Sequence, residues 1–232
     1  MLFEHVSFAV APGGAVLVSG PNGVGKSSLI RIAAGLLRPA DGEVTVPPQR
    51  ALMAEAAALD PARPLGAALH FWATLDPAPA SATERVAKAL EAVGLAAIAA
   101  VPVRLLSTGQ RRRAALARVV ASGAPLWLLD EPFGALDEIT RFALNQTLLS
   151  LCQPHDGTPP ATAVFVTHSV YEAVFLSQRI VVMARPGRVV DEIAIDEPYP
   201  RDAAFRTTPR FTAWCAQVSD ALQRASTASV PA

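Results

Sequence analysis

The segment AVLVSGPNGVGKSSL, residues 15–29, decides the fold. Its first four residues are apolar and, with Ser19, suit a short buried strand, and residues 20–27 fit the pattern GxxxxGK[ST]. The next dozen residues alternate as an amphipathic helix that ends near Gly35. A strand, a glycine-rich turn and a helix in this order turn backbone N–H groups inward, where they bind phosphate.

This arrangement is a P-loop, and each part of it has an expected task. Lys26 is expected to reach the β- and γ-phosphates of a nucleotide, the Ser27 hydroxyl to bind Mg²⁺, and Ser28 to lie near the α-phosphate. The alternative is a glycine-rich turn without chemical meaning, which the preceding strand and following helix argue against. The expected nucleotide-binding residues are Gly20, Pro21, Asn22, Gly23, Val24, Gly25, Lys26, Ser27 and Ser28.

A second apolar run, Leu-Trp-Leu-Leu at residues 126–129, leads directly into Asp130 and Glu131. The end of a buried strand is a costly place for two carboxylates unless a positive group meets them. Asp130 is expected to hold Mg²⁺ through water, and Glu131 to polarise the attacking water as general base. The alternative is a solvated acidic strand end.

Composition narrows the function classes. The 232 residues include 20 Lys plus Arg and 20 Asp plus Glu, which argues against a nucleic-acid partner held by a broad positive field. Cys152 and Cys215 are far apart and are interpreted as ordinary thiols. No apolar run reaches the roughly 18 residues of a membrane span, and no signal peptide follows Met1, so another chain is expected to supply any spans.

The order of elements predicts an α/β fold. Short buried runs are expected to form a mostly parallel sheet, at residues 15–19, 126–129, 163–167 and 180–183. Residues 81–120 have helical spacing and are expected to form an inserted helical subdomain. Residues 153–160 are expected to be a surface loop, and residues 211–225 a last helix. Phe3 and Phe8 are interpreted as alternate core positions of a strand.

A third motif separates this chain from other P-loop proteins. The stretch Leu106-Ser107-Thr108-Gly109-Gln110, before a basic helix, resembles the LSGGQ signature of ABC ATPases. Residues 134–137, Gly-Ala-Leu-Asp, are similar to the D-loop of that family, and His168 after Val166 and Thr167 resembles its switch histidine. Taken alone, His168 could also be a hydrogen-bonded structural histidine.

The resemblance implies a fold and a division of the chain. The fold is an α/β P-loop NTPase core with a mostly parallel sheet, a small antiparallel β portion and an inserted helical subdomain. The whole of residues 1–232 is then one ABC ATPase domain. Its core is residues 1–55 and 121–196, its helical subdomain is residues 56–120 approximately, and residues 197–232 form the C-terminal helix and tail.

The resemblance also implies a mechanism. Two copies form a head-to-tail dimer that sandwiches two ATP molecules with Mg²⁺, beneath a transmembrane permease subunit at the cytoplasmic face of the inner membrane. Ser107 and Gly109 of one copy bind the γ-phosphate held by the other, and Gln110 and Asp137 join the nucleotide-binding set. The implied catalytic residues are Glu131, His168 and Lys26.

The chain departs from the family at two positions. Most members of the family carry an aromatic residue that stacks on adenine, in a loop before the strand that leads toward the P-loop, and we expect this chain to begin beyond that point. The family also has a glutamine that binds metal or water after the strand that opens the helical subdomain. Glu55 is the nearest match here, and its carboxylate remains able to bind a metal.

Within the family, the two parts of the chain resemble different branches. Residues 2–132 are similar to the ATPase subunit of the bacterial heme exporter of cytochrome c maturation, in phrases such as residues 69–72 and 101–107. Residues 133–225 resemble ATPases of nitrate, sulfonate and taurine importers. The first reading predicts heme export and the second predicts import. A soluble ABC protein without a membrane partner and a non-hydrolysing binder are the alternatives from other classes.

Overall fold

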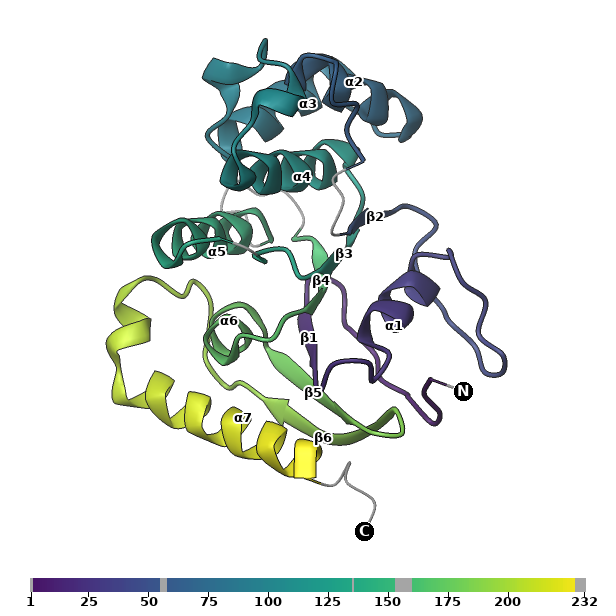
Figure 1. The fold of residues 1–232 in the computed structure, drawn as a ribbon, viewed down its shortest axis with the longest axis vertical. Helices are drawn as coiled ribbons and strands as arrows, with labels where there is room; N and C mark the ends of the chain where they lie inside the picture. Colours follow the sequence, from purple (N-terminus) through teal and green to yellow (C-terminus); the bar gives the residue numbers. More distant parts are fainter. Residues whose placement is uncertain (1, 55–57, 135, 153–159, 228–232) are drawn as a thin grey trace.

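The chain folds around one six-stranded sheet in the computed structural model (Figure 1). The structure describes residues 2–54, 58–134, 136–152 and 160–227. Strand order is β2-β3-β4-β1-β5-β6, and every pair is parallel except the antiparallel pair β5–β6. The strands are β1 Ala15–Ser19, β2 Arg50–Met53, β3 Leu126–Asp130, β4 Thr162–Val166, β5 Arg179–Ala184 and β6 Arg188–Ala194.

Helices lie on both sides of this sheet. Helix α1 packs against β3 and β4, while α7 packs against β5, β6 and α6 (Figure 1). The helices are α1 Lys26–Ala33, α2 Leu65–Leu75, α3 Ala82–Ala92, α4 Thr108–Ser122, α5 Glu138–Cys152, α6 Val170–Leu176 and α7 Pro209–Thr227. Single turns of 3₁₀ helix cover Ala96–Ile98, Val103–Leu105 and Ala204–Thr207. The expected α/β fold with a mostly parallel sheet is confirmed, and β2 and β6 are additions to the four expected strands.

Register brings the chemical groups to one edge of the sheet. Asp130 of β3 lies opposite Val166 of β4, and Val166 lies opposite Val18 of β1. The carboxyl ends of parallel strands therefore coincide, which is where open α/β sheets bind ligands. The P-loop begins directly after β1, Asp130 ends β3 with Glu131 next to it, and His168 lies two residues after the end of β4.

Helices α2, α3 and α4 pack on one another at a distance from most of the sheet (Figure 1). Helix α3 begins with a capping box, in which the Ser81 hydroxyl accepts from the Glu84 N–H at 3.2 Å and the Glu84 carboxylate accepts from the Ser81 N–H at 3.1 Å. Arg85 joins all three helices, because its guanidinium donates to the carbonyl oxygens of Ala73 and Ala121. The capping box of α3 and the contacts of Arg85 thus stabilise the packing of α2, α3 and α4.

The N-terminal segment corrects one expectation. Residues 2–14 contain no strand, so the strand interpretation of Phe3 and Phe8 is wrong. Their core positions are nonetheless right, since both side chains are partly buried against a core cluster that includes Val18 and Ile30. The segment lacks a ladder partner among the described residues, and its Glu4 N–H donates to the Gly187 carbonyl at 2.9 Å instead. Alternating burial without a paired neighbour does not make a strand.

Arg201 anchors the C-terminal segment and is only 4% exposed. Its Nη1 donates to the Val174 carbonyl at 2.7 Å and the Ser177 carbonyl at 2.8 Å, which end helix α6. Its guanidinium lies 4.6 Å from the centroid of the Tyr199 ring. A buried cation is stable there because carbonyl dipoles surround it.

Replacing Arg201 with lysine is expected to cost about 2–4 kcal/mol of unfolding free energy. The planar guanidinium donates to several carbonyl oxygens at once, and a lysine ammonium cannot reach all of them. The melting temperature should fall by roughly 5–15 °C. Arg224→Lys is the matched control, since Arg224 pairs with Asp191 at the surface. Equal melting temperatures for the two variants would contradict this role for Arg201.

Within the described residues, no helix is long and apolar enough to cross a membrane.

Candidate functional site

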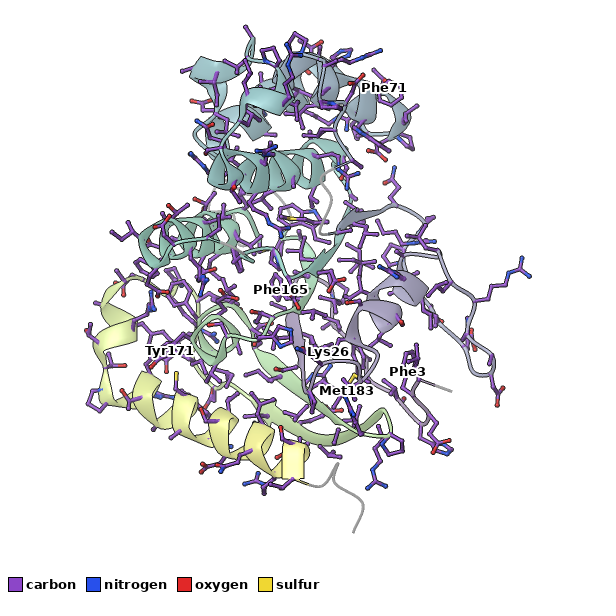
Figure 2. The ribbon with its side chains drawn as sticks, viewed as in Figure 1. Phe3, Lys26, Phe71, Phe165, Tyr171 and Met183 are labelled. Atoms are coloured by element: carbon purple, nitrogen blue, oxygen red, sulfur yellow. The ribbon has the colours of Figure 1, made fainter. Side chains whose placement is uncertain are left out.

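The glycine-rich turn between β1 and α1 has the backbone that phosphate binding requires. Gly20, Gly23 and Gly25 have φ values of +146°, +77° and +107°, which L side chains rarely adopt. A Cβ on Gly20 would lie 2.3 Å from the Met183 carbonyl oxygen, so only glycine fits there. Figure 2 labels Met183 and Lys26 near each other at this end of the sheet.

Lys26 opens helix α1 and is 6% exposed. Its Nζ donates to the carbonyl oxygens of Gly20 at 2.8 Å and Pro21 at 3.0 Å, so the ammonium spans the loop. Burial lowers the pKa of Lys26, and the nearby carboxylates of Glu131 and Asp130 oppose that shift. A buried ammonium at the N-terminus of a helix, facing inward N–H groups, fits a polyphosphate.

Ser27 and Asp130 make the oxygen-rich side of the site. The Ser27 hydroxyl donates to Asp130 Oδ1 at 3.1 Å, across 103 residues of sequence. A hydroxyl and a carboxylate are hard oxygen ligands of the kind Mg²⁺ takes, and Mg²⁺ completes its shell with waters and phosphate oxygens. Among the described residues there is no cluster of three or more His, Cys, Asp or Glu side chains that could hold a metal by themselves. The donor set therefore fits a nucleotide-bound Mg²⁺.

Glu131 and His168 meet beside this oxygen pair. His168 Nε2 lies 2.6 Å from Glu131 Oε1, and the two side chains are 46% and 48% exposed. Glu131 has a φ of +49°, a left-handed conformation that costs about 1–3 kcal/mol for a residue other than glycine. Its N–H donates to the Val166 carbonyl at 3.0 Å, which holds the strained residue in place. The carboxylate and the imidazole thus face solvent together, where a water and a phosphate could reach both.

The signature residues lie on a separate element, the N-terminus of helix α4. Ser107 is the N-cap, and its hydroxyl accepts from the Gln110 N–H at 3.2 Å while Gln110 Oε1 accepts from the Ser107 N–H at 2.8 Å. Gly109 packs toward α5, where an added Cβ would lie 3.5 Å from Thr140 Cγ2. The capped helix end presents N–H groups and a partial positive charge suited to an anion.

Asp137 caps helix α5, since its Oδ1 accepts from the Thr140 N–H at 2.9 Å, and this hydrogen bond lowers its pKa. The structure therefore joins Lys26, Ser27, Asp130, Glu131 and His168 around the end of β1, β3 and β4. Ser107, Gly109, Gln110 and Asp137 lie on the neighbouring surface of α4 and α5. Glu55 lies outside the described residues.

Two supporting contacts are absent from the sequence interpretation. Arg185 Nη2 donates to the Asn22 carbonyl at 3.0 Å, which ties the P-loop to the turn after β5. The Phe3 ring lies against Gly25, where an added Cβ would be 2.5 Å from Phe3 Cδ1. No local pattern points to either contact, because each joins residues more than twenty positions apart.

Comparison with known proteins agrees with this geometry. The profile described as ABC transporter matches residues 3–134, which is more than half of the chain. An ATP-binding protein of Brucella abortus is 36% identical over 228 residues, covering 92% of this chain and 84% of the relative. This chain belongs to the ABC transporter family.

Other relatives and solved structures refine the placement of this ABC protein. The cytochrome c biogenesis ATP-binding export protein CcmA of Sphingopyxis alaskensis is 55% identical over 138 residues, covering 60% of this chain and 70% of the relative. The ATP-binding cassette MJ0796, solved as a dimer in a post-hydrolysis state with ADP and Pi, aligns with a TM-score of 0.73. That match covers 84% of this chain and 91% of MJ0796, at 25% identity.

These findings confirm the fold and the enzyme class. The chain is an ATP-binding and ATP-hydrolysing ABC subunit of a transporter. Cassettes of this family are dimeric, as the MJ0796 structure is.

Proposed function

We propose that this chain powers heme export for cytochrome c maturation, as a head-to-tail dimer bound to a separate transmembrane subunit at the cytoplasmic face of the membrane. The proposal of heme as the substrate rests on the 55% identity to the Sphingopyxis export protein. A second protein of that description, from Zymomonas mobilis, is 48% identical over 148 residues, covering 64% of this chain and 65% of the relative.

The proposed roles of the site residues follow the geometry. The P-loop N–H groups and Lys26 bind the phosphates, and Ser27 with Asp130 holds Mg²⁺, which supplies charge neutralisation at the phosphates when bound. Glu131 accepts the proton of the attacking water, and His168 holds the γ-phosphate and orients Glu131 through their 2.6 Å contact. Ser107, Gly109, Gln110 and Asp137 act on the nucleotide of the second copy.

The proposed division of labour assigns partner binding to the helical cluster. Residues 1–55 and 121–196 form the ATPase core, residues 56–120 approximately form the helical subdomain, and residues 197–232 form the C-terminal part. Helix α2 exposes Phe71 and Leu75 at 49% and 60% (Phe71 is labelled in Figure 2). A groove of about 170 Å³ lies beside Phe71 and Trp72. An exposed apolar surface with a groove suits a helix of the membrane partner.

Import of nitrate, sulfonate or taurine is the second candidate. It rests on the importer-like sequence of residues 133–225, which holds the D-loop, the switch histidine and the C-terminal helix. Heme export is favoured because the exporter-like half contains the proposed partner-binding helices α2 and α3.

Deletion of the gene in its own host separates the two candidates. Heme export predicts loss of heme-staining c-type cytochromes, restored by the wild-type gene and not by Glu131→Gln. Normal cytochromes with lost growth on nitrate, sulfonate or taurine would support import instead. Affinity purification from membranes tests the transport role itself: without an integral membrane partner in the purified complex, both candidates fail.

A further inference from the structure

A buried carboxylate lies between the D-loop and the switch histidine, and the proposed chemistry gives it no task. Glu172 is 3% exposed and belongs to helix α6. Its Oε2 accepts a hydrogen bond from the Thr167 hydroxyl. Burial raises the pKa of Glu172, and the Thr167 hydrogen bond and the Arg141 charge oppose that shift. Burying an ionisable carboxyl group costs folding free energy, so the contacts of Glu172 indicate why it is there.

Thr167 holds the backbone on both sides of His168. The Thr167 hydroxyl, while donating to Glu172, accepts from the Ser169 N–H at 3.1 Å. The Thr167 carbonyl accepts from the Ser19 hydroxyl, at the end of β1, at 3.3 Å. The Thr167 side chain therefore fixes the residue after His168, while the Ser19 hydroxyl fixes the Thr167 backbone before it. Glu172 sets the orientation of the Thr167 side chain.

Arg141 of helix α5 approaches Glu172 from the D-loop. Its Nη2 donates to the Leu136 carbonyl at 2.9 Å, and its backbone N–H donates to the Asp137 carbonyl at 2.9 Å. Its Nε lies 3.7 Å from Glu172 Oε1. The Arg141 side chain therefore contacts the D-loop backbone and faces the carboxylate that orients Thr167.

Arg141 and Glu172 lie near each other without forming a hydrogen bond. The Nε of Arg141 is buried without a hydrogen-bond partner, and 3.7 Å is nearly 1 Å longer than a charged N–H···O hydrogen bond. A cavity of about 460 Å³ borders Arg141, His168 and Tyr171, which leaves space for these side chains to move. A small shift of α5 would complete the hydrogen bond.

We propose that Arg141, Glu172 and Thr167 are positioning residues that set His168 according to the position of the D-loop. The proposal rests on the proposed roles of His168 and Asp137. Contact of a second copy with the D-loop moves Leu136 and Arg141 together, and Arg141 closes on Glu172. The closed pair then fixes Thr167, and Thr167 keeps His168 in the contact with Glu131 that already measures 2.6 Å. Dimer formation and the hydrolytic step are thereby linked within each chain.

Steady-state ATP hydrolysis by the purified full chain tests this, with Glu172→Gln, Arg141→Met and Thr167→Val. Each should lower kcat by about 10- to 100-fold, since small misplacement of a catalytic group has costs of this size. KM for ATP should stay within about twofold, because the phosphate-binding loop is untouched. Thr167→Ser keeps the hydroxyl and should restore most of the activity. Arg179→Met and Glu192→Gln are matched controls, from a surface pair 3.4 Å apart on β5 and β6.

Making the same substitutions in a His168→Ala variant tests whether Glu172 positions His168 or only maintains the fold. Glu172→Gln should lower kcat by no more than about twofold there, because its effect passes through His168. An equal loss of kcat with and without His168 would overturn the relay, and so would kcat values that match the Arg179 and Glu192 controls. If melting curves show that Glu172→Gln is unfolded, the Thr167→Val and Thr167→Ser pair decides the question alone.

The outcomes also separate the relay from the proposed function. A wild-type chain that does not hydrolyse ATP overturns the proposed function and the relay together. A His168→Ala variant with wild-type kcat overturns the proposed role of His168 and, with it, the relay. Hydrolysis that depends on His168 but not on Arg141, Glu172 or Thr167 overturns the relay alone.

Discussion

Replacing Glu131 with glutamine should lower ATP turnover by at least about 100-fold, because removal of a general base typically costs a factor of 10²–10⁴. The amide keeps the shape of the side chain and its capacity to hydrogen-bond His168 Nε2, which lies 2.6 Å from Glu131 Oε1. It cannot accept the proton of the attacking water. ATP affinity should therefore change little, since the P-loop and Lys26 remain intact.

Phosphate release and equilibrium ATP binding, measured on the same preparation, check the Glu131 prediction. Glu192→Gln is the control, because Glu192 pairs with Arg179 at the surface of the sheet. Turnover within about threefold of the wild type would mean that another group takes the proton, and the general-base role of Glu131 would be wrong.

The Lys26→Met variant should lose ATP binding as well as hydrolysis. Methionine keeps the apolar stem that is buried at the start of α1 but removes the ammonium that spans the Gly20 and Pro21 carbonyls. A charge-assisted contact to phosphate is worth about 1.5–3 kcal/mol, so Kd for ATP should rise by roughly 10- to 150-fold. Calorimetric titration with Mg-ATP measures this directly.

Lys88 provides the control for Lys26, since the chain has only these two lysines and Lys88 is exposed on α3. Lys88→Met should bind ATP as the wild type does. Tight ATP binding by Lys26→Met at an unchanged melting temperature would contradict the phosphate-binding role of Lys26.

Local sequence patterns predict most of the candidate site. The strand Ala15–Ser19 is followed by six loop residues, 20–25, and then by helix α1. This order fixes the turn, the φ values and the direction of Lys26, because strand, glycine turn and helix are adjacent in sequence. The pairing of Ser27 with Asp130 is also predictable, because Asp130 ends β3 and Ser27 opens the helix after β1, and the carboxyl ends of these parallel strands share an edge. The resemblance to ABC ATPases added the signature, the D-loop and the role of His168.

Contacts between distant segments were not predictable in the same way. Arg201, Arg141 and Glu172 carry no motif, and their importance appears only when α5, α6 and the C-terminal segment are packed together. Phe3 and Phe8 show the opposite case, in which an alternating pattern was right about burial and wrong about the strand. Periodicity reports which side chains face the core, while a strand also needs a hydrogen-bonded neighbour.

The dimer is the central claim, because the P-loop residues precede helix α1 while the signature residues begin helix α4. The most direct test is the rate of ATP hydrolysis as a function of protein concentration for the purified chain at saturating Mg-ATP. The account predicts a rate that rises faster than linearly at low concentration, as two copies complete each site. A rate strictly proportional to concentration down to the lowest dilution, with the mass of a monomer in solution, would contradict it.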